Sequence, residues 1–458
     1  MLLRTLAGVG AGRVSRARRG AEVMGKAKSQ ALAAGANREK GGSAAALQIA
    51  FSGSSAGAGS WKGGVLTVGV LEGDVQADAD GNFEQLLGSA SETDKLLGGV
   101  LSELAHESDF KGKSGSSSFA RTGSHSGAQR VGLVGLGKAD DLANSKNLKP
   151  LKQLGGALAD ESKASKKSSA AVLLPPLPSD INNKSAAAAV AQGTMVSAFT
   201  ETRYKQSAKP TPLETVEMLN DGTEFSDELK HARTQAEGIM LAKELVNGPA
   251  AHVTPTTLAQ TFEEIAKKSP STLKLSVLGK KECEDRKMEP FLAVSQGSAK
   301  DPKFIHLQYT PEGGTSQNAE RIALVGKGIT YDSGGVNIKP SQGGLTELMK
   351  FDMGGAGAVA GAATVIANEQ PKDITVDFIV PACENMVDAD SYRPGDILTA
   401  SNGKTMEITN TDAEGRLVLS EGMIYAEELG ATKVVDIATL TGESKDVRWL
   451  FALLKDIS

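Results

Sequence analysis

Short apolar runs alternate with helix-forming stretches along most of the chain, and this alternation limits the folds that are open to it. Brief apolar runs joined by helices are typical of parallel-rich sheets with helices on their faces. In the first half of the sequence, the predicted strands are Val65–Val70, Val131–Gly135 and Ala171–Leu174, and the predicted helices lie near 83–105, 147–162 and 184–199. The serine- and glycine-rich stretch 107–128 is predicted to be a loop.

The same alternation returns beyond a boundary that we place at 206–250. There a polar stretch with Pro210 and Pro212 precedes a long helix over about 226–246, which Asn247-Gly-Pro249 ends. The strands predicted beyond it are Leu273–Leu278, Phe304–Tyr309, Ile322–Val325, Val376–Val380 and Val434–Ile437, and the helices are 256–267, 354–367 and 414–429. The predicted fold class is therefore α/β: an N-terminal α/β domain over 61–205, and a C-terminal α/β domain over 251–458 with a mainly parallel central sheet flanked by helices.

Composition excludes several classes of protein. The chain has 50 Lys and Arg against 55 Asp and Glu, and a net charge of -5 gives no reason to expect nucleic acid or an anionic membrane as partner. Two cysteines, Cys283 and Cys383, cannot form a disulfide framework. No apolar run reaches the ~18–20 residues that a membrane-spanning helix needs. We expect a protein that binds neither nucleic acid nor membrane.

The first 60 residues differ in composition from the rest. Residues 1–40 contain nine basic and two acidic residues, and the first 21 contain no acidic residue. An arginine-rich, acid-poor start is typical of an organellar transit peptide, most simply a mitochondrial one, and a disordered basic tail is the alternative. Residues 25–60 have the composition of a flexible linker. We expect a basic leader and linker over 1–60, and a mitochondrial or otherwise cytoplasmic location.

Four glycine-flanked acidic residues lie at predicted strand ends or helix starts in the second half. They are Asp332 in Gly326-Lys-Gly-Ile-Thr-Tyr-Asp-Ser-Gly-Gly, Asp352 in Lys350-Phe-Asp-Met-Gly-Gly, and Asp412 and Glu414 in Asn410-Thr-Asp-Ala-Glu-Gly-Arg-Leu. Each alone has a simpler explanation, because Thr411-x-x-Glu414 matches a helix capping box and Asp352 could cap the helix at Gly354. Ligands bind beyond the carboxyl ends of parallel strands, so we expect the four to converge there.

Four converged carboxylates require compensating positive charge, because buried unpaired charges are costly. Two divalent cations would supply it. An Asp- and Glu-rich set suits Zn²⁺, Mn²⁺, Mg²⁺ or Co²⁺ in a two-metal site. All five histidines lie outside these motifs, and the chain has no His-Glu-x-x-His zinc motif.

These motifs resemble the leucyl (cytosol) aminopeptidase family. The string Asn410–Leu417 is the family signature, and Gly326–Gly335, Lys339-Pro340 and Lys350–Gly355 also match. Supporting matches are Ala242–Pro249, Cys383-Glu-Asn-Met386, Pro394-Gly-Asp396 and Asp436–Gly442. The clear resemblance covers about 226–442, so the domain over 251–458 is expected to be catalytic.

The resemblance implies a metal-dependent aminopeptidase that releases the N-terminal residue of peptides, with leucine and other apolar residues preferred. It implies two divalent metal ions per chain, zinc or manganese first. The metal ligands it implies are Lys327, Asp332, Asp352, Asp412 and Glu414, and Asp332 and Glu414 would bridge the two ions. Lys327 would have to bind as a neutral amine, because an ammonium has no lone pair.

The resemblance also assigns catalytic and substrate-binding roles. Lys339 would stabilise the developing oxyanion, and Arg416 would hold a bicarbonate ion as general base, since its planar fork matches a planar anion. The substrate-binding residues implied are Asn410, Thr439, Leu440 and Gly442. A homohexamer is the implied assembly. Taken alone, Lys327 could be a surface lysine and Arg416 a member of a helix salt bridge.

The resemblance stops after Gly442, where a short tail to Ser458 replaces elements that complete the sheet and the pocket in the family. The catalytic domain is therefore expected to be incomplete. A second hypothesis is a non-catalytic structural or scaffolding relative, for example within mitochondria. All named metal and catalytic positions precede the break, which favours the enzyme.

Overall fold

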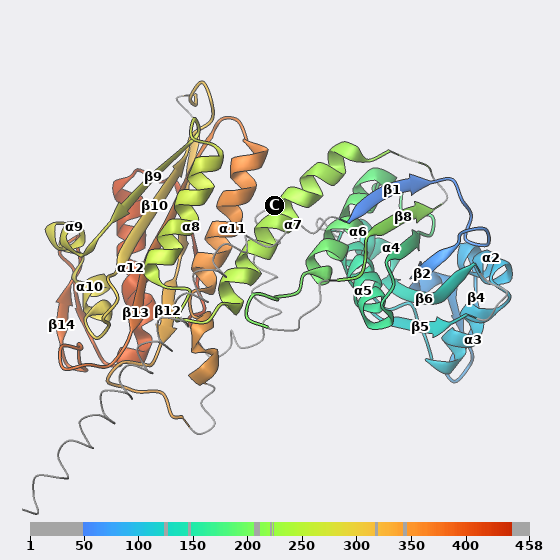
Figure 1. The fold of residues 1–458 in the computed structure, drawn as a ribbon, viewed down its shortest axis with the longest axis horizontal. Helices are drawn as coiled ribbons and strands as arrows, with labels where there is room; N and C mark the ends of the chain where they lie inside the picture. Colours follow the sequence, from blue (N-terminus) through green and yellow to red (C-terminus); the bar gives the residue numbers. More distant parts are fainter. Residues whose placement is uncertain are drawn as a thin grey trace, which may run out of the picture. The chain divides into compact units, whose positions relative to one another are not determined.

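A computed structural model describes most of the chain outside its two ends. The described residues are 49–122, 127–144, 148–205, 211–219, 222, 224–316, 319–341 and 346–441. Residues 1–46 and 201–209 form a unit of their own, of which only 201–205 are described. The helices and strands of the described residues belong to the other unit, 47–200 and 210–458 (Figure 1). Residues 1–48 of the leader and linker expected over 1–60 lie outside the described residues. The linker prediction is wrong for Ala50–Ser54, because these residues form a strand that pairs with Thr215–Leu219.

The first α/β half is built on a six-stranded sheet in the order β1-β8-β7-β2-β6-β5. All its pairings are parallel except that of β5 with β6. Its strands are β1 (Ala50–Ser54), β2 (Gly63–Leu71), β5 (Ser117–Arg121), β6 (Ala128–Gly137), β7 (Ser169–Leu173) and β8 (Thr215–Leu219), and β3 (Val75–Ala77) pairs with β4 (Phe83–Leu86). Its helices are α2 (Gly88–Leu96), α3 (Val100–Glu107), α4 (Ala139–Ala143), α5 (Lys149–Ser165) and α6 (Asn183–Ala198).

This sheet buries apolar side chains on both faces. Val134 and Leu136 of β6 pack with α5 and α6, whereas Val131 and Leu133 of the same strand pack with α2 and α3. The alternation reflects the period of two residues along a strand. The parallel-rich sheet with helices on both faces was predicted, and the structure confirms it.

Two predictions for this half are wrong in detail. The stretch 107–128 contains β5 and is not only a loop, because Ser117–Arg121 pairs antiparallel with β6. The predicted helix over 83–105 begins with strand β4 and is split between α2 and α3. The break falls at Gly98 and Gly99, whose φ angles of 77° and 87° are left-handed and cannot continue a helix.

The second α/β half contains the motifs. Its helices are α7 (Ser226–Asn247), α8 (Pro255–Lys268), α9 (Lys280–Asp285), α10 (Glu289–Ser295), α11 (Gly354–Glu369) and α12 (Glu414–Glu428), with short 3-10 helices η2 (Thr346–Phe351) and η3 (Thr411–Ala413). Its strands are β9 (Leu273–Leu278), β10 (Lys303–Tyr309), β11 (Glu320–Gly326), β12 (Gly328–Asp332), β13 (Ile374–Asn385), β14 (Ile397–Thr399), β15 (Thr405–Glu407) and β16 (Lys433–Ile437). The predicted strands and helices of this half all form, and the strands β12, β14 and β15 and the helices α9 and α10 are additions.

The central sheet of this half runs in the order β16-β11-β13-β10-β9, with β12 also pairing β13. The pairs β16–β11, β11–β13 and β12–β13 are parallel, and the two pairs that involve β10 are antiparallel. Parallel strands end at the same edge of a sheet. The carboxyl ends of β11, β12, β13 and β16 therefore meet at one edge, where the motif residues follow them.

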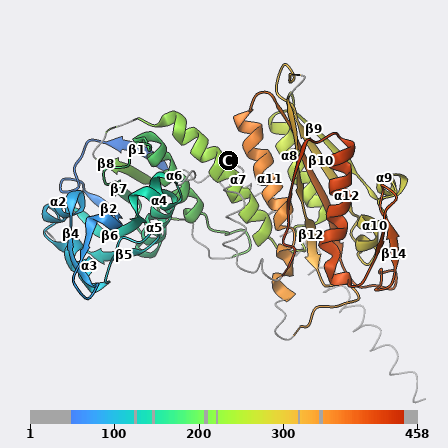
Figure 2. The same cartoon turned by 180° about the vertical axis from the view of Figure 1, so that it is seen from behind.

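Helices cover both faces of this sheet. The α8 and α11 side chains share an apolar core with Leu324 and Phe378, while α10 and α12 share another with Val325 and Ile379. Successive residues along β11 and along β13 therefore pack against helices on opposite faces of the sheet. Figure 2 shows the molecule from behind, with α12 in view. No helix within the described residues is long and apolar enough to cross a membrane. The domain limits at 61–205, 206–250 and 251–458 stay predictions.

Candidate metal centre

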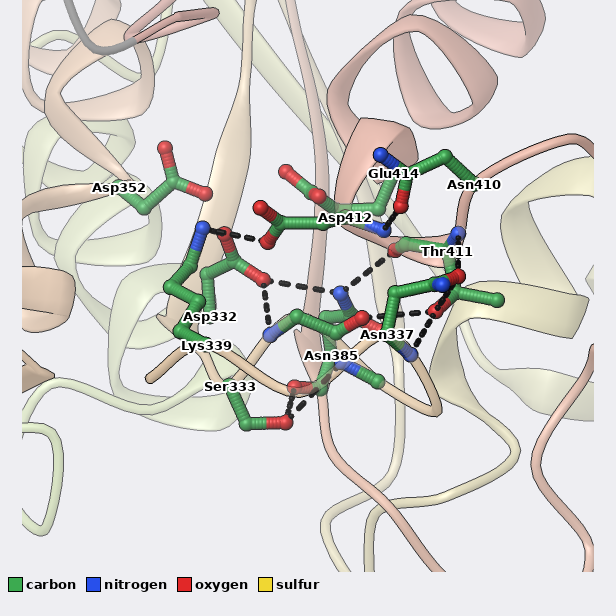
Figure 3. Close-up of polar contacts among 12 residues, drawn as sticks. Asp332, Ser333, Asn337, Lys339, Asp352, Asn385, Asn410, Thr411, Asp412 and Glu414 are labelled. Carbon is green, nitrogen blue, oxygen red and sulfur yellow. Dashed lines mark hydrogen bonds and ion pairs between the residues drawn. The ribbon is translucent and has the colours of Figure 1, made fainter. Parts of the chain in front are cut away.

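Four chain segments bring the predicted metal ligands to the carboxyl edge of the second sheet. Lys327 lies between β11 and β12, and Asp332 ends β12. Asp352 precedes α11, Asp412 lies in η3, and Glu414 is the first residue of α12. Figure 3 shows the four carboxylates pointing toward one region, with Lys339 between Asp332 and Asp412. The predicted convergence is therefore confirmed.

Glycines allow these segments to approach closely. A Cβ at Gly355, in the first turn of α11, would collide with the Ile437 carbonyl oxygen and the Lys327 nitrogen. A Cβ at Gly415 would lie 2.8 Å from Lys327 Nζ. Gly355 thus allows α11 to approach the backbone of Lys327 and Ile437, and Gly415 leaves space for the Lys327 side chain.

Lys327 is buried between two of the carboxylates. Its Nζ lies 2.9 Å from Asp352 Oδ1 and 2.7 Å from Glu414 Oε1, and it donates a hydrogen bond to the Thr439 carbonyl oxygen at 3.1 Å. The Lys327 side chain is 2% exposed. A surface role for Lys327 is therefore wrong.

Lys339 makes the equivalent contacts with the other two carboxylates. Its Nζ lies 2.8 Å from Asp332 Oδ2 and also pairs with Asp412 Oδ1. Two ammonium groups thus face four carboxylates, so negative charge is in excess. Such an excess in a buried site requires further positive charge.

Burial and charge shift several pKa values in the site. Burial raises the pKa of Asp352 well above its usual range; Lys327 opposes this effect, and the charges of Glu414 and Asp332 add to it. Burial alone would lower the pKa of Lys339, but its bonds to Asp332 and Asp412 outweigh burial and raise it. The Lys339 ammonium is therefore protonated at neutral pH.

The carboxylates leave oxygen atoms available to a cation. Asp352 Oδ2 and Glu414 Oε2 are buried and have no hydrogen-bond partner among the described residues. One ligand oxygen from each of Asp332, Asp352 and Glu414 lies within 4.8 Å of the others. Buried acceptors of this kind are normally satisfied. The residues present therefore fit a divalent cation.

The helix-capping alternative does not explain these acidic residues. The N-cap residue is Met353 in α11 and Ala413 in α12, and neither makes a side-chain capping hydrogen bond. The Thr411 hydroxyl instead donates to the Gly334 carbonyl oxygen at 2.7 Å. Asp352 Oδ1 accepts a hydrogen bond from the Thr439 hydroxyl at 2.7 Å.

The other predicted site residues differ in their placement. Asn410 caps η3 by accepting a hydrogen bond from the Asp412 nitrogen at 2.9 Å. Thr439 contacts Asp352 and Lys327, as given above, and Leu440 is 46% exposed beside Gly415. Arg416 is exposed in the first turn of α12. Gly442 lies outside the described residues.

Sequence reasoning missed several polar residues that hold the ligand segments. Asn385 donates to Asp332 and to the Thr411 carbonyl oxygen, Tyr392 donates to the same carbonyl oxygen, and Asn337 accepts from the Thr411 nitrogen. The signal for Asn385 was present, since it lies in the matching string Cys383-Glu-Asn-Met386. Resemblance to a family motif does not show which residues Asn385 contacts, and its partner Thr411 lies 26 residues away in sequence.

Two family descriptions match this chain. "Cytosol aminopeptidase family, catalytic domain" matches residues 240–446, and "Cytosol aminopeptidase family, N-terminal domain" matches residues 67–209. The first half, for which the sequence offered only an α/β rhythm, is thus also similar to the family.

Individual relatives agree with these matches. Leucine aminopeptidase 2, chloroplastic, of Arabidopsis thaliana is 44% identical over 86% of this chain and 67% of its own length. Leucine aminopeptidase 1 of Arabidopsis thaliana is 42% identical over 83% of this chain and 72% of its own length. The solved structure of a tomato leucine aminopeptidase mutant superposes with a TM-score of 0.73 at 36% identity, covering 88% of this chain and 75% of that one.

The relatives correct the expected location. Several that are named with a compartment are chloroplastic, from Arabidopsis thaliana, Oryza sativa and Solanum lycopersicum. The mitochondrial prediction is therefore wrong. Arginine-rich, acid-poor composition is shared by mitochondrial and chloroplast transit peptides, so it could not separate the two.

The matches cover both halves of the chain, and the relatives' names state an aminopeptidase activity. Neither they nor the site supports the scaffolding alternative. The carboxylate cluster lies within the matched catalytic domain. The chain belongs to the cytosol aminopeptidase family and is a metallo-exopeptidase of the aminopeptidase type.

Proposed function

We propose that this chain is a two-metal aminopeptidase that removes leucine and other apolar residues from peptide N-termini. The observation that carries the proposal is the buried cluster of Asp332, Asp352 and Glu414 with carboxylate oxygens that lack partners among the described residues. Relatives named leucine aminopeptidase support the substrate class. Zinc and manganese are the proposed metals, because both accept carboxylate ligands in two-metal sites.

The proposed ligands fall into two overlapping sets. Asp332, Asp412 and Glu414 would hold one cation, and Lys327, Asp332, Asp352 and Glu414 would hold the other. When bound, such cations lower the pKa of water and polarise a carbonyl. Lys327 would exchange its ion pairs with Asp352 and Glu414 for a bond through its neutral amine.

Lys339 is proposed to stabilise the charge that develops on the scissile carbonyl oxygen. Its ammonium is held by Asp332 and Asp412, and these bonds raise its pKa, so the positive charge is retained at neutral pH. A fixed charge in a partly buried site is worth more than one in water. Loss of one such group typically costs about 10²–10³ in kcat.

Arg416 is proposed to hold bicarbonate as general base. The residue follows Glu414 by two positions on α12 and is exposed. Its guanidinium has the planar fork that binds a planar oxyanion through two hydrogen bonds. If this role is correct, Arg416→Lys should lose the bicarbonate dependence of the rate.

Leu440 is proposed to form part of the pocket for the apolar N-terminal side chain. It is exposed, and its Cδ1 would lie 2.9 Å from a Cβ at Gly415, which places it beside the first turn of α12. Asn410 and Thr439 are proposed to line the substrate site with it, as is Gly442. Leu440→Ala should raise KM for leucine amide more than it lowers kcat.

The test is metal analysis of the purified full chain together with a leucine amide assay. About two Zn²⁺ or Mn²⁺ per chain with turnover supports the proposal. Glu414→Gln should lower turnover about 100-fold or more, because outer partners of metal ligands already cost about 10–100-fold. The matched control is Glu427→Gln, an exposed carboxylate on the same helix. A soluble, metal-free, inactive wild-type chain would contradict the proposal.

We further propose a plastid location and a homo-oligomeric, hexameric assembly. The location rests on the chloroplastic relatives, and import of the full chain into isolated chloroplasts but not mitochondria tests it. The assembly rests on the family resemblance. Light scattering should give six times the chain mass of 47.4 kDa, and a monomer would contradict it.

A further inference from the structure

Asn385 links the two motifs that carry most of the proposed metal ligands. It is the last residue of β13 and is 0% exposed. Its Nδ2 donates to Asp332 Oδ1 at 2.8 Å and to the Thr411 carbonyl oxygen at 3.0 Å, as Figure 3 shows. Asp332 ends β12, and Thr411 begins the η3 turn that holds Asp412. One amide group therefore bridges segments that are far apart in sequence.

Both protons of the Asn385 amide are used in this bridge. A side-chain amide nitrogen carries two N–H donors, and each finds one acceptor here. The orientation of the amide follows from the same contacts, because the reversed amide would place its oxygen against Asp332 Oδ1. The Asn385 backbone is fixed separately, since its carbonyl oxygen accepts from the Ser333 nitrogen at 2.9 Å and hydroxyl at 2.8 Å.

The bridge determines how the Asp332 carboxylate is turned. Oδ1 accepts from Asn385 and from the Gly334 nitrogen at 2.9 Å, which leaves Oδ2 to face Lys339. Gly334 has a φ of 88°, in the left-handed region, and so contributes its nitrogen at a turn that favours glycine. Rotation of the carboxylate would break both bonds to Oδ1.

The oxygen of the Asn385 side-chain amide also bears on the role of this residue. Asn385 Oδ1 is buried without a hydrogen-bond partner among the described residues. A buried polar group of this kind normally opposes stability. An asparagine at this position is thus better explained by the two donors it supplies to Asp332 and Thr411 than by a contribution to folding.

We propose that Asn385 is a positioning residue of the metal centre. It orients Asp332 and holds the η3 turn at the correct distance from it, so that both present their oxygens to the same cations. This inference rests on the proposed two-metal function. It goes beyond the ligand set, because Asn385 is not itself a ligand and acts through Asp332. Loss of such outer partners typically lowers metal affinity about 10–100-fold.

The control is Tyr392→Phe. The Tyr392 hydroxyl donates to the same Thr411 carbonyl oxygen at 2.8 Å, and its side chain is also buried, since the residue is 3% exposed. Within the described part of the chain, Asp332 Oδ1 accepts from Asn385 and Gly334 and not from Tyr392. Tyr392→Phe therefore removes one hydrogen bond from the η3 turn and leaves both donors of Asp332 Oδ1 in place.

The experiment titrates Mn²⁺ into the metal-free full chain by calorimetry, for wild type, Asn385→Ala, Asn385→Leu and Tyr392→Phe. The alanine variant should fold, because Asp332 keeps the Gly334 donor and Thr411 keeps the Tyr392 donor. The leucine variant retains most of the side-chain volume. Both Asn385 variants should bind Mn²⁺ about 10–100-fold more weakly. Tyr392→Phe should bind Mn²⁺ with an affinity near that of wild type, because Asp332 keeps its bonds to Asn385 and Gly334.

Melting of the metal-free proteins separates positioning from folding. We expect Asn385→Ala and Tyr392→Phe to melt at similar temperatures although their Mn²⁺ affinities differ. Wild-type affinity in both Asn385 variants, equal weakening by Tyr392→Phe, or failure of both Asn385 variants to fold without metal would each overturn the inference. Absence of Mn²⁺ binding by the wild-type chain would instead overturn the proposed function on which it rests.

Discussion

Two buried aspartates of the catalytic half lie in opposite electrostatic surroundings. Asp377, in β13, is 0% exposed and accepts hydrogen bonds from Arg321 Nε at 2.7 Å and Gln308 Nε2 at 3.0 Å, and it contacts His306 Nε2 at 2.8 Å. Burial would raise its pKa, but these bonds outweigh burial and lower the pKa to about 2. Asp352 is also buried, yet its pKa is raised.

The difference lies in which charges surround each carboxylate. Both oxygens of Asp377 accept hydrogen bonds from donors on β10 and β11. Asp352 shares Lys327 with Glu414, faces two other carboxylates, and keeps Oδ2 without a partner among the described residues. The lowered pKa of Asp377 means that its carboxylate stabilises the fold, whereas the incompletely paired Asp352 carboxylate marks a site suited to another cation. The comparison therefore separates a structural cluster from a functional one.

Substitution of the two aspartates should affect catalytic activity very differently. Asp352→Asn should lower leucine amide turnover about 100-fold or more, because a ligand should cost more than the roughly 10–100-fold of an outer partner. Asp377→Asn should leave turnover per folded molecule near wild type. Steady-state kinetics on both variants, with the folded fraction from circular dichroism, checks this. Similar loss in both would remove the distinction between the two clusters.

Added Mn²⁺ should stabilise the folded protein strongly only when Asp352 is intact. At a free Mn²⁺ concentration of about 100 times Kd, wild type and Asp377→Asn should gain about 2.7 kcal/mol of unfolding free energy for each cation that they bind. Asp352→Asn should gain much less, since one ligand is gone. Thermal melts with EDTA and with Mn²⁺ measure the gain. An equal gain in Asp352→Asn would mean that the cation binds elsewhere.

Without metal, removal of the carboxylate charge should destabilise the folded protein at Asp377 but not at Asp352. Without metal, Asp377→Asn should lose about 1.5–3 kcal/mol of unfolding free energy, the usual range for hydrogen bonds to a charged group. Asp352→Asn should be no less stable than wild type, because burial, together with the charges of Glu414 and Asp332, outweighs Lys327 and disfavours the Asp352 carboxylate. Urea denaturation in EDTA gives both values. A marked loss in Asp352→Asn would show that Asp352 is a structural carboxylate.

The pKa of Asp377 should also make the stability of the folded protein depend on pH in the acid range. The pKa of Asp377 is about 2 in the folded chain against a usual 3.8, so the unfolded chain takes up the proton first as pH falls. The stabilisation is complete above about pH 4 and is lost toward about pH 2. Between about pH 4 and 3, wild type should lose about 1 kcal/mol more than Asp377→Asn. Parallel urea titrations at the two pH values test this, and equal losses would contradict it.

Much of this arrangement was predictable from local sequence. Glycine-flanked acids after short apolar runs predicted where Asp332, Asp352 and Glu414 would meet, because parallel strands end at a common edge. The antiparallel strands β9 and β10 were predicted as strands but not by direction, since apolar runs carry no information on pairing. The glycine break at 98–99 was overlooked within a helical pattern.

The partners of the site residues could not be predicted in the same way. Asn385 and Tyr392 lie in stretches without unusual composition, and the contact of Asn385 with Asp332 depends on the register of β12 against β13. The Asp377 cluster has the same origin, because His306, Arg321 and Asp377 come from three strands. Buried polar contacts between distant segments require the fold to be known.

Anomalous diffraction from crystals soaked in Mn²⁺ would locate the cations directly. We expect them at the cluster of Asp332, Asp352 and Glu414, where carboxylate oxygens lack partners among the described residues. We predict two anomalous peaks per chain at this cluster, with Asp352 Oδ2 and Glu414 Oε2 among the ligands, and none at Asp377. Peaks only at other carboxylates, or a cluster without a peak at saturating Mn²⁺, would show that these carboxylates do not form a metal site.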